Sequence, residues 1–540
     1  KQELKSVNET LVKVSKIDEN ELTQQLQEKL AKGKLQDANN DGIVDETDIE
    51  AVKEIIKEEK KQKIDFIVEN SSDENTTFLS DVIDQSDEQN IGETIEKIIE
   101  TKDTLVEGVV GNLSDKDNTF LTTTTTEGAG LIKEKIFETI VAKETDKSAE
   151  VLSKVMAKAD TATINSVINN ITEKNTNQES KLSLKVMADF SEKNPEKLET
   201  LAQTNKDQVD KLTVAAVQSA KSTNEDSQLI AKVVAVASDE IANKVVEEVS
   251  KNASAEKQSL SAKVLKAIVD TQPNKIETLN EEIKTTVISQ AIEAAKNQEE
   301  GGLIEEDNLS DVVADIVVKT DAATASKVIE EVNNTETESS LSLKVMSGIS
   351  DKDANKINQL AETNKESIDK LTEKAVQSAK STNEDSQLIA KVVAVASDEI
   401  ANKVVEEVSK NASAEKQSLS AKVLKAIVDT QPNKIETLNE EIKTTVISQA
   451  IEAAKNQQEG TSIDDEDLSN TVAEIVTKAD NDTAAKVLES LDEATTGTES
   501  KLALTVVNNL TKQENYEEKI EILSVTSSIV EQNITKLIEK

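Results

Sequence analysis

Twelve residues near the start of the chain combine the side-chain types and the spacing of a loop that binds a divalent cation. The segment from residue 37 to residue 48 reads DANNDGIVDETD. Calcium takes six to eight oxygen ligands, and a twelve-residue loop supplies them from positions 1, 3, 5, 7, 9 and 12, with glycine at position 6. The predicted ligands are the side chains of Asp37, Asn39, Asp41, Asp45 and Asp48 and the backbone carbonyl of Ile43.

Two amphipathic segments flank this loop and must position it. Residues 20–32 have a helical pattern that Gly33 ends. Directly after the loop, DIEAVKEIIK runs into a second helical pattern, and we expect Val44 to point inward and tie the loop to the core. The apolar residues Ile49, Val52, Ile55 and Ile56 are expected on one face of that helix. The sequence therefore predicts an EF-hand-like helix–loop–helix.

This segment resembles the calcium-binding half of a bacterial dockerin, in which DxNxDGxVxxxD is followed directly by a helix. The resemblance covers Asp37 to about Ile56 and no other part of the chain. A complete dockerin carries two such loops, and no second copy is found here, so cohesin binding does not carry over. The resemblance implies calcium and a bacterial surface or extracellular location.

The remainder of the chain is organised around a segment that occurs twice. Residues 216–298 return without a change at residues 375–457, an offset of 159 positions. The offset persists outside the identical segment, where LSDVVADIV at Leu309–Val317 returns as LSNTVAEIV at Leu468–Val476. A fixed long period is typical of a repeat architecture.

Each long repeat contains smaller modules of about 31 residues. Apolar residues recur at one-face helical spacing, pause at a polar break, and then resume. Pro195, Pro273 and Pro432 all follow such a break, where proline suits the first turn of a second helix. Some modules leave room for an extra helix, such as residues 205–221 or 281–297. We therefore predict an all-α fold, an elongated α-solenoid of helix–turn–helix hairpins.

The composition is consistent with stacked modules and restricts the possible partners. Aromatic residues make up 1% of the chain, and Val, Ile, Leu and Ala fill the apolar positions. Such small interfaces suit an array in which each module meets only its neighbours. The formal charge of −42 argues against nucleic acid as a partner, because phosphate binding needs a positive surface. No apolar run is long enough for a transmembrane helix.

No catalytic group of residues emerges from the sequence. The chain has no His and no Cys, which excludes Ser–His and Cys–His nucleophiles and imidazole or thiolate metal sites. The S-x-x-K spacing at Ser254–Lys257, and its copy at Ser413–Lys416, lacks the companion motifs of the enzymes that use it. We therefore expect a protein that is not an enzyme.

These patterns predict five regions: an N-terminal helical segment with the calcium loop (1–62), divergent helical repeats with the Thr-rich stretch Thr122–Thr126 (63–144), two super-repeats (145–303 and 304–462) and a partial third (463–540). The functional expectation is an extracellular or cell-surface, bacterial structural protein: a self-assembling, calcium-binding subunit of a filament, sheath or surface layer. The alternative is a monomeric solenoid binding module or adhesin stalk that presents repeated surfaces to a protein or glycan. Polymerisation separates the two.

Overall fold

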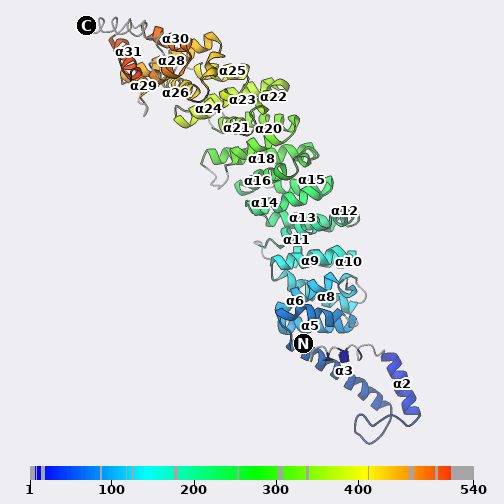
Figure 1. The fold of residues 1–540 in the computed structure, drawn as a ribbon. Coiled ribbons are helices and arrows are strands. Elements are labelled where there is room, and N and C mark those ends of the chain that lie inside the picture. The colour runs from blue at the N-terminus through cyan, green and yellow to red at the C-terminus, as the bar shows by residue number, and fades with distance from the viewer. Residues whose placement is uncertain are drawn as a thin grey trace. The chain divides into compact units, whose positions relative to one another are not determined.

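In the computed structural model, regular secondary structure is helical throughout the described residues, as the sequence predicts. The structure describes residues 6–7, 9–11, 13, 19–84, 88–116, 118–123, 127–174, 180–251, 254–301, 308–335, 340–410, 413–460, 467–492 and 497–512. Contacts divide the chain into two compact units, Lys1–Glu248 and Val249–Lys540. The division falls inside the first copy of the repeated 83-residue segment. Each unit is an α-solenoid of stacked helical hairpins (Figure 1).

The first unit begins with a helical hairpin and continues as stacked helices. Its elements are α2 (Glu19–Ala31), α3 (Glu46–Glu69), η1 (Asp73–Asn75), α4 (Thr76–Asp84), α5 (Glu88–Lys102), η2 (Asp103–Leu105), α6 (Val106–Asp115), α7 (Thr119–Thr122), α8 (Glu127–Val141), α9 (Asp146–Lys158), α10 (Thr161–Asn169), η3 (Asn170–Lys174), α11 (Leu182–Lys193), α12 (Pro195–Thr204), α13 (Lys206–Ser219) and α14 (Asn224–Val236). Helix α15 (Asp239–Ser250) runs across the division.

The second unit repeats the same pattern of elements. They are α16 (Ala255–Thr271), α17 (Asn274–Glu277), α18 (Glu281–Glu299), α19 (Leu309–Lys319), α20 (Ala322–Asn334), α21 (Leu341–Lys352), α22 (Lys356–Thr363), α23 (Lys365–Ser378), α24 (Asn383–Val395), α25 (Asp398–Ser409), α26 (Ala414–Thr430), α27 (Asn433–Glu436), α28 (Glu440–Gln458), α29 (Leu468–Lys478), α30 (Asn481–Asp492) and α31 (Gly497–Leu510). The predicted extra helices are therefore real: α13 and α18 occupy those places.

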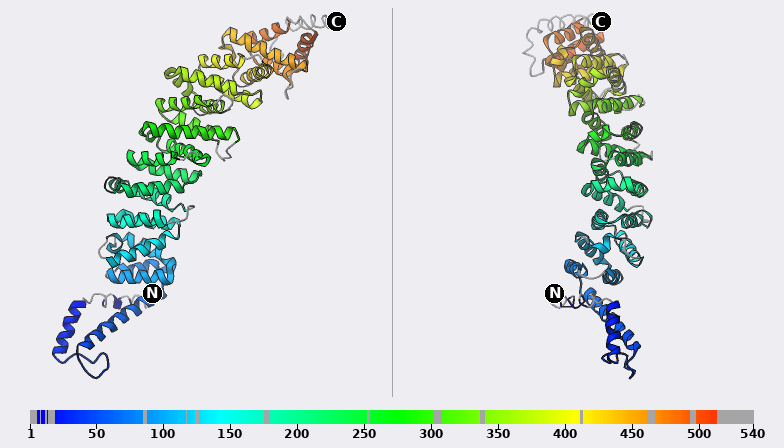
Figure 2. Two further views of the ribbon diagram at one scale, coloured as in Figure 1. Left: turned by 180° about the vertical axis from the view of Figure 1, so that it is seen from behind. Right: turned by 90° about the vertical axis from the view of Figure 1, so that its right-hand side faces the viewer.

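Within each unit the helices form two layers (Figure 2). In the second unit the first layer consists of α16, α19, α21, α24, α26, α29 and α31, each packed on the next. The second layer consists of α18, α20, α23, α25, α28 and α30, again packed in order. Contacts thus run between near neighbours in sequence, which is the property that defines a solenoid.

The core lies between the two layers and consists almost entirely of aliphatic side chains. Leu260, Val264 and Ile268 on α16 are fully or almost fully buried, and so are their counterparts on other first-layer helices. Their spacing of four residues places them on one helical face. Side-chain caps fix where many helices begin, because Thr, Asp, Asn and Ser accept hydrogen bonds from the first free N–H groups. Thr223 in this way accepts from the N–H of Asp226 at the start of α14.

Lysines cap the other ends of the helices, reaching from one stacked module to the module before it. The Nζ of Lys197 donates to the carbonyl of Ala159 at the end of α9, at 3.2 Å. Lys434 makes the same contact with Ala396 at the end of α24, at 2.7 Å. The last carbonyls of a helix lack partners within the helix and carry partial negative charge, so a cation there satisfies and stabilises them.

Several local expectations have clear outcomes. Pro195 begins α12, and Pro273 and Pro432 directly precede α17 and α27, so proline does sit at the start of second helices. Within the Thr-rich stretch, Thr122 ends α7 and Thr123 caps it. Residues 124–126 lie outside the described residues. The sequence pattern also predicts a closing helix near residues 527–539, and these residues lie outside the described part of the chain.

Candidate metal site

The predicted calcium loop connects α2 to α3, as the helix–loop–helix pattern requires. Gly33 ends the first helix at a φ of +62°, and Gly42 turns the loop at a φ of +84°. A side chain at such positive φ is strained, so glycine is the residue that permits each turn. Asn40 also has positive φ, which asparagine tolerates better than most residues. These three residues therefore let the chain turn between α2 and α3.

Asp48, the last predicted ligand, is completely buried and connects the two ends of the loop. Its Oδ1 accepts from the N–H groups of Ala38, at 2.6 Å, and Asn39, at 3.3 Å. Its Oδ2 accepts from the N–H of Asp45 at 2.8 Å, and this bond is the main cause of the lowered pKa of Asp48. Asp45 in turn caps α3 by accepting from the N–H of Thr47, so loop and helix start are one hydrogen-bonded structure.

Asp37, the first predicted ligand, has one carboxylate oxygen in a hydrogen bond and the other without a partner. Its Oδ2 accepts from the N–H of Gly42 at 2.9 Å. Its Oδ1 is buried and has no hydrogen-bond partner. A buried carboxylate oxygen without a partner is costly, and a bound cation is one group that would satisfy it.

The remaining predicted side-chain ligands make hydrogen bonds within the loop. Asn39 accepts from the N–H of Asp41 at 3.0 Å, and Asp41 accepts from the N–H of Ile43 at 2.7 Å. The amide of Asn39 donates to the Thr47 hydroxyl at 2.9 Å. In this arrangement the described residues contain no group of three or more acidic side chains close enough to hold a metal ion. The structure thus brings the six residues into one loop without gathering their carboxylates.

The oxygen atoms of the predicted ligands, including the unpartnered Oδ1 of Asp37, fit calcium, because calcium is a hard cation that prefers oxygen ligands. Asp37, Asn39, Asp41, Asp45 and Asp48 would supply side-chain oxygens, and Ile43 its carbonyl. Four neighbouring carboxylates repel one another when no cation lies among them, so they turn to backbone N–H groups instead. A cation would supply the charge that draws them together.

Two expectations about the apolar residues near the loop are wrong. Val44 does not point into a core, since 44% of it is exposed, and Ile55 is 54% exposed although it was expected on the buried face with Ile49. The apolar residues of α3 that are buried lie near its two ends, Ile49 at the start and Ile64, Ile67 and Val68 at the end, so the turns between them, which include Ile55, are not covered. Ile43 remains exposed beside Val44.

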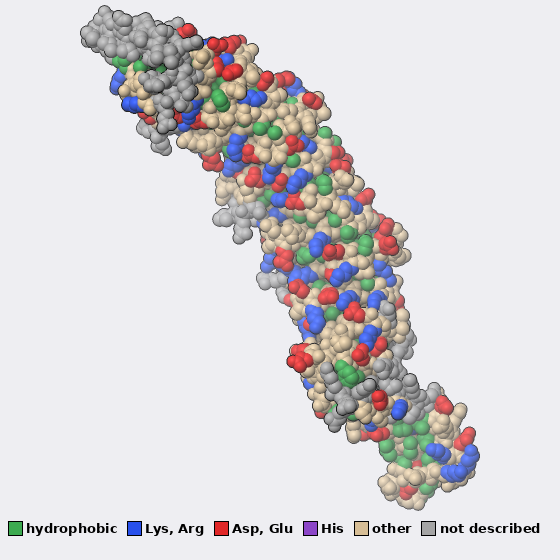
Figure 3. All heavy atoms as spheres, viewed as in Figure 1, with side chains coloured by type: hydrophobic (Ala, Val, Ile, Leu, Met, Phe, Trp, Pro, Cys, Tyr) green, Lys and Arg blue, Asp and Glu red, His purple; other side chains and the backbone are tan. Residues whose placement is uncertain are grey.

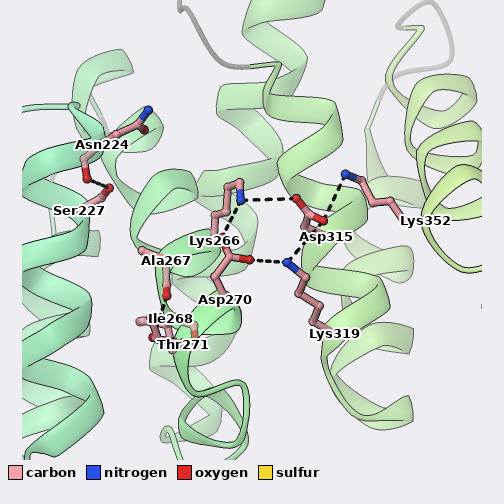
Figure 4. Close-up of polar contacts among 10 residues, drawn as sticks. All are labelled: Asn224, Ser227, Lys266, Ala267, Ile268, Asp270, Thr271, Asp315, Lys319 and Lys352. Atoms are coloured by element: carbon pink, nitrogen blue, oxygen red, sulfur yellow. Dashed lines mark hydrogen bonds and ion pairs between the residues drawn. The ribbon is translucent and has the colours of Figure 1, made fainter.

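A second polar arrangement, in the first layer of the second unit, does not follow from the sequence pattern. Asp315 on α19 lies within ion-pair distance of Lys266 (3.7 Å), Lys319 (3.8 Å) and Lys352 (3.2 Å), which come from three successive helices of that layer. Lys266 and Lys319 also pair with Asp270 (Figure 4). The two lysines help to lower the pKa of Asp270, although its partial burial acts in the opposite direction. This network joins successive modules and contains no reactive group.

No model of a known protein family matches the chain, and no curated protein matches it in sequence. Among solved structures it is similar to that of APUM23 with GGAAUUGACGG, at 11% identity over 100% of both chains, with a TM-score of 0.24. It is also similar to a chain of the Pds5–Scc1 complex, at 12% identity over 98% of this chain and 86% of that one, with a TM-score of 0.23. TM-scores this low carry no argument about partners.

Proposed function

We propose that the chain is an extracellular, bacterial structural protein: a calcium-binding subunit that self-assembles into a filament, sheath or surface layer. In this proposal the stacked helices are a spacer and the N-terminal hairpin is the calcium-dependent end. The protein has no enzymatic role, and nucleic acid is not its partner. Among the described helices, none is both long and apolar enough to cross a lipid bilayer.

The observation that carries the calcium part is the buried, unpartnered Oδ1 of Asp37. It lies in a loop whose other five predicted ligands have the required residue types and spacing. Loops of this type in extracellular modules bind calcium in roughly the 10⁻⁴–10⁻³ M range, which suits a surface where calcium is plentiful.

The proposed structural role is supported by the ion pairs and lysine caps that connect neighbouring modules. Ion pairs repeatedly join one module to the next, such as Lys391 with Asp351 at 3.0 Å and Lys344 with Glu299 at 2.6 Å. Lysine amines also cap helix ends of the preceding module, as Lys356 does for Thr320 at 2.9 Å. Charged groups paired in this way hold the stack together, and a spacer needs that more than it needs a reactive site.

The first test is calcium binding by the full chain, measured by isothermal titration calorimetry. Asp37→Asn should weaken binding at least about tenfold, because it removes a charged ligand from the first loop position. The matched control is Glu46→Gln, an exposed loop residue outside the predicted ligand set that changes the net charge equally. Equal affinity of Asp37→Asn and the wild-type chain would contradict the calcium assignment.

The second test is electron microscopy of the purified chain at rising concentration, with calcium and with a chelator. Regular filaments or sheets that disperse on chelation are expected. Filaments that persist unchanged in chelator would remove calcium from the assembly step while leaving the structural function in place. Single particles under every condition would contradict self-assembly.

One observation favours the adhesin stalk or binding module as a second candidate. Of five exposed large hydrophobic side chains among the described residues, Ile43, Val44 and Ile55 belong to the N-terminal hairpin of α2 and α3. Figure 3 shows hydrophobic side chains gathered on the surface of this hairpin. A stalk that presents a binding end would gather exposed apolar residues there. Capture of a protein or glycan by a chain that stays monomeric would support this candidate.

A further inference from the structure

Three acidic ligands of the predicted calcium loop each have one carboxylate oxygen in a hydrogen bond to a backbone N–H group of the loop. The three bonds run from Gly42 to Oδ2 of Asp37 at 2.9 Å, from Ile43 to Oδ1 of Asp41 at 2.7 Å, and from Thr47 to Oδ1 of Asp45 at 2.8 Å. A bond to one oxygen restrains the direction of the other oxygen of the same carboxylate. The loop backbone therefore orients these ligands.

A side chain outside the predicted ligand set connects two of the ligands across the loop. The hydroxyl of Thr47 donates to Oδ1 of Asp45 at 2.5 Å, and it accepts from the amide Nδ2 of Asn39 at 2.9 Å. Asn39 and Asp45 stand at positions 3 and 9 of the loop. Within residues 37–48, all of which the structure describes, no other side chain outside the ligand set makes a hydrogen bond to a ligand side chain.

The hydroxyl of Thr47 has a defined place because Thr47 belongs to the first turn of α3. Asp45 caps this helix, and Ile49, one half-turn after Thr47, is buried. The start of the helix therefore fixes where the hydroxyl lies relative to the loop. Ligand spacing does not select this residue, since it stands at position 11, between the predicted ligands at positions 9 and 12.

The two bonds of the Thr47 hydroxyl act on two different ligands. On Asp45, the hydroxyl and the backbone N–H of Thr47 both donate to Oδ1, so Oδ2 is the oxygen that is left to face a cation. On Asn39, the bond to Thr47 determines which side of the amide carries the nitrogen. Its Oδ1 accepts from the N–H of Asp41 at 3.0 Å and has a second lone pair for a cation.

We propose that Thr47 is a positioning residue of the calcium loop, whose hydroxyl orients Asn39 and Asp45 toward the cation. This inference rests on the proposed calcium binding and adds a residue outside the ligand set to that site. Groups that hold metal ligands by hydrogen bonds commonly contribute about ten- to a hundredfold to metal affinity. Asn39, Asp45 and Thr47 are exposed, so water competes for these bonds and the lower end of that range is expected here.

The test is isothermal titration calorimetry of the full chain with calcium chloride. Thr47→Val keeps the shape of the side chain and the backbone N–H but removes the hydroxyl, and it should weaken calcium binding about tenfold. Thr47→Ser keeps the hydroxyl and should restore the wild-type affinity. The matched control is Thr101→Val, the same change at an exposed position on α5, and it should bind like the wild-type chain.

A double-mutant cycle tests whether Thr47 acts through Asn39. Asn39→Ala weakens binding by itself because it removes a predicted ligand. In that background Thr47→Val should cost less than it does in the wild-type chain, because one of its two bonds no longer exists. Equal costs in both backgrounds would overturn the role of the bond between Thr47 and Asn39.

The luminescence lifetime of bound europium(III) gives a reading of ligand orientation. This ion prefers oxygen ligands as calcium does, and its lifetime reports how many water molecules it carries. Thr47→Val should add about one water molecule to the bound ion, because a ligand that turns away is replaced by water. A weaker affinity with an unchanged number of water molecules would overturn the positioning role.

The outcomes separate this inference from the proposed function. A wild-type chain that binds no calcium would overturn both. Calcium binding that is equally strong in the wild-type chain and in Thr47→Val would overturn the role of Thr47 while the calcium assignment stands. Equal weakening in Thr47→Val and Thr47→Ser would overturn the role of the hydroxyl. Circular dichroism of each variant should match that of the wild-type chain, since Thr47 is exposed and its loss leaves the helices folded.

Discussion

The two copies of the 83-residue segment have the same sequence but different neighbours. Helices α14 and α24 span the same thirteen residues and have the same cap, with Thr223 accepting from Asp226 and Thr382 from Asp385. Helices α16 and α26 likewise span corresponding residues, and so do α17 and α27. Local structure therefore follows the sequence wherever the segment occurs.

The environments of one aspartate differ between the copies. Asp226 is completely buried, and Lys181 of the preceding module pairs with it at 2.7 Å. At the position that corresponds to Lys181 the second copy has Ser340, and Asp385 is only half-buried. Both aspartates accept the same local bond, from the N–H of Lys221 or of Lys380, at 2.7 Å. The comparison shows that identical segments acquire different stabilities from the modules that contact them.

The largest effect should come from the shared core and should be the same in both copies. Leu260→Ala and Leu419→Ala each remove a fully buried side chain, which costs about 2–5 kcal/mol of the free energy of unfolding. Urea denaturation followed by circular dichroism measures both. Costs that differ by more than about 1 kcal/mol would show that the neighbours affect the core as well as the surface.

A smaller effect should separate the two copies. Lys181→Met leaves the buried carboxylate of Asp226 without its charge partner and should cost about 2 kcal/mol, since Lys181 itself is partly exposed. The matched change in the second copy, Ser340→Met, removes no ion pair of Asp385 and should cost less. The same urea titrations test this. Equal costs would mean that the ion pair does not distinguish the copies.

The smallest effect concerns an exposed ion pair that both copies retain. Hydrogen bonds from Lys284 and Lys327 lower the pKa of Glu281 to about 2, from 4.5. Because the folded pKa is the lower one, the stabilisation is complete above pH 4.5 and is lost as the pH falls toward 2. Lys327→Met should raise the pKa of Glu281, measured by carbon NMR of its carboxyl group. An unchanged pKa would show that Lys284 alone sets it.

Much of the fold could be predicted from residues alone, because helical period and capping are local properties. The three prolines, the repeated polar breaks and the scarcity of aromatic residues all favour a stack of helical hairpins, and the structure has one in each unit. Ligand spacing is also a local property, and on that basis the six loop residues stay a prediction. The exposure of Val44 and Ile55 could not, since it depends on how little of α3 meets another helix.

The lysines that connect one module to the one before it stand at a recognisable place in the sequence, but only the structure shows what they contact. Lys197 and Lys434 each follow a proline by two residues and precede an apolar residue at the start of a second helix. The pattern alone reads as an exposed lysine in a first turn. The structure shows both amines on the last carbonyl of a helix about 38 residues earlier.

The sequence by itself thus determined the helices and their pairing into hairpins, and it predicts the ligand residues of a calcium loop between α2 and α3. Hydrogen bonds within helices and ligand spacing within a loop join residues that are close in sequence, so their pattern is visible there. Tertiary structure decided which carboxylates are buried, which lysines cap which helices, and that Oδ1 of Asp37 is buried without a hydrogen-bond partner. Those outcomes depend on which surfaces meet when the modules stack. The helical repeat pattern within one module does not contain that information.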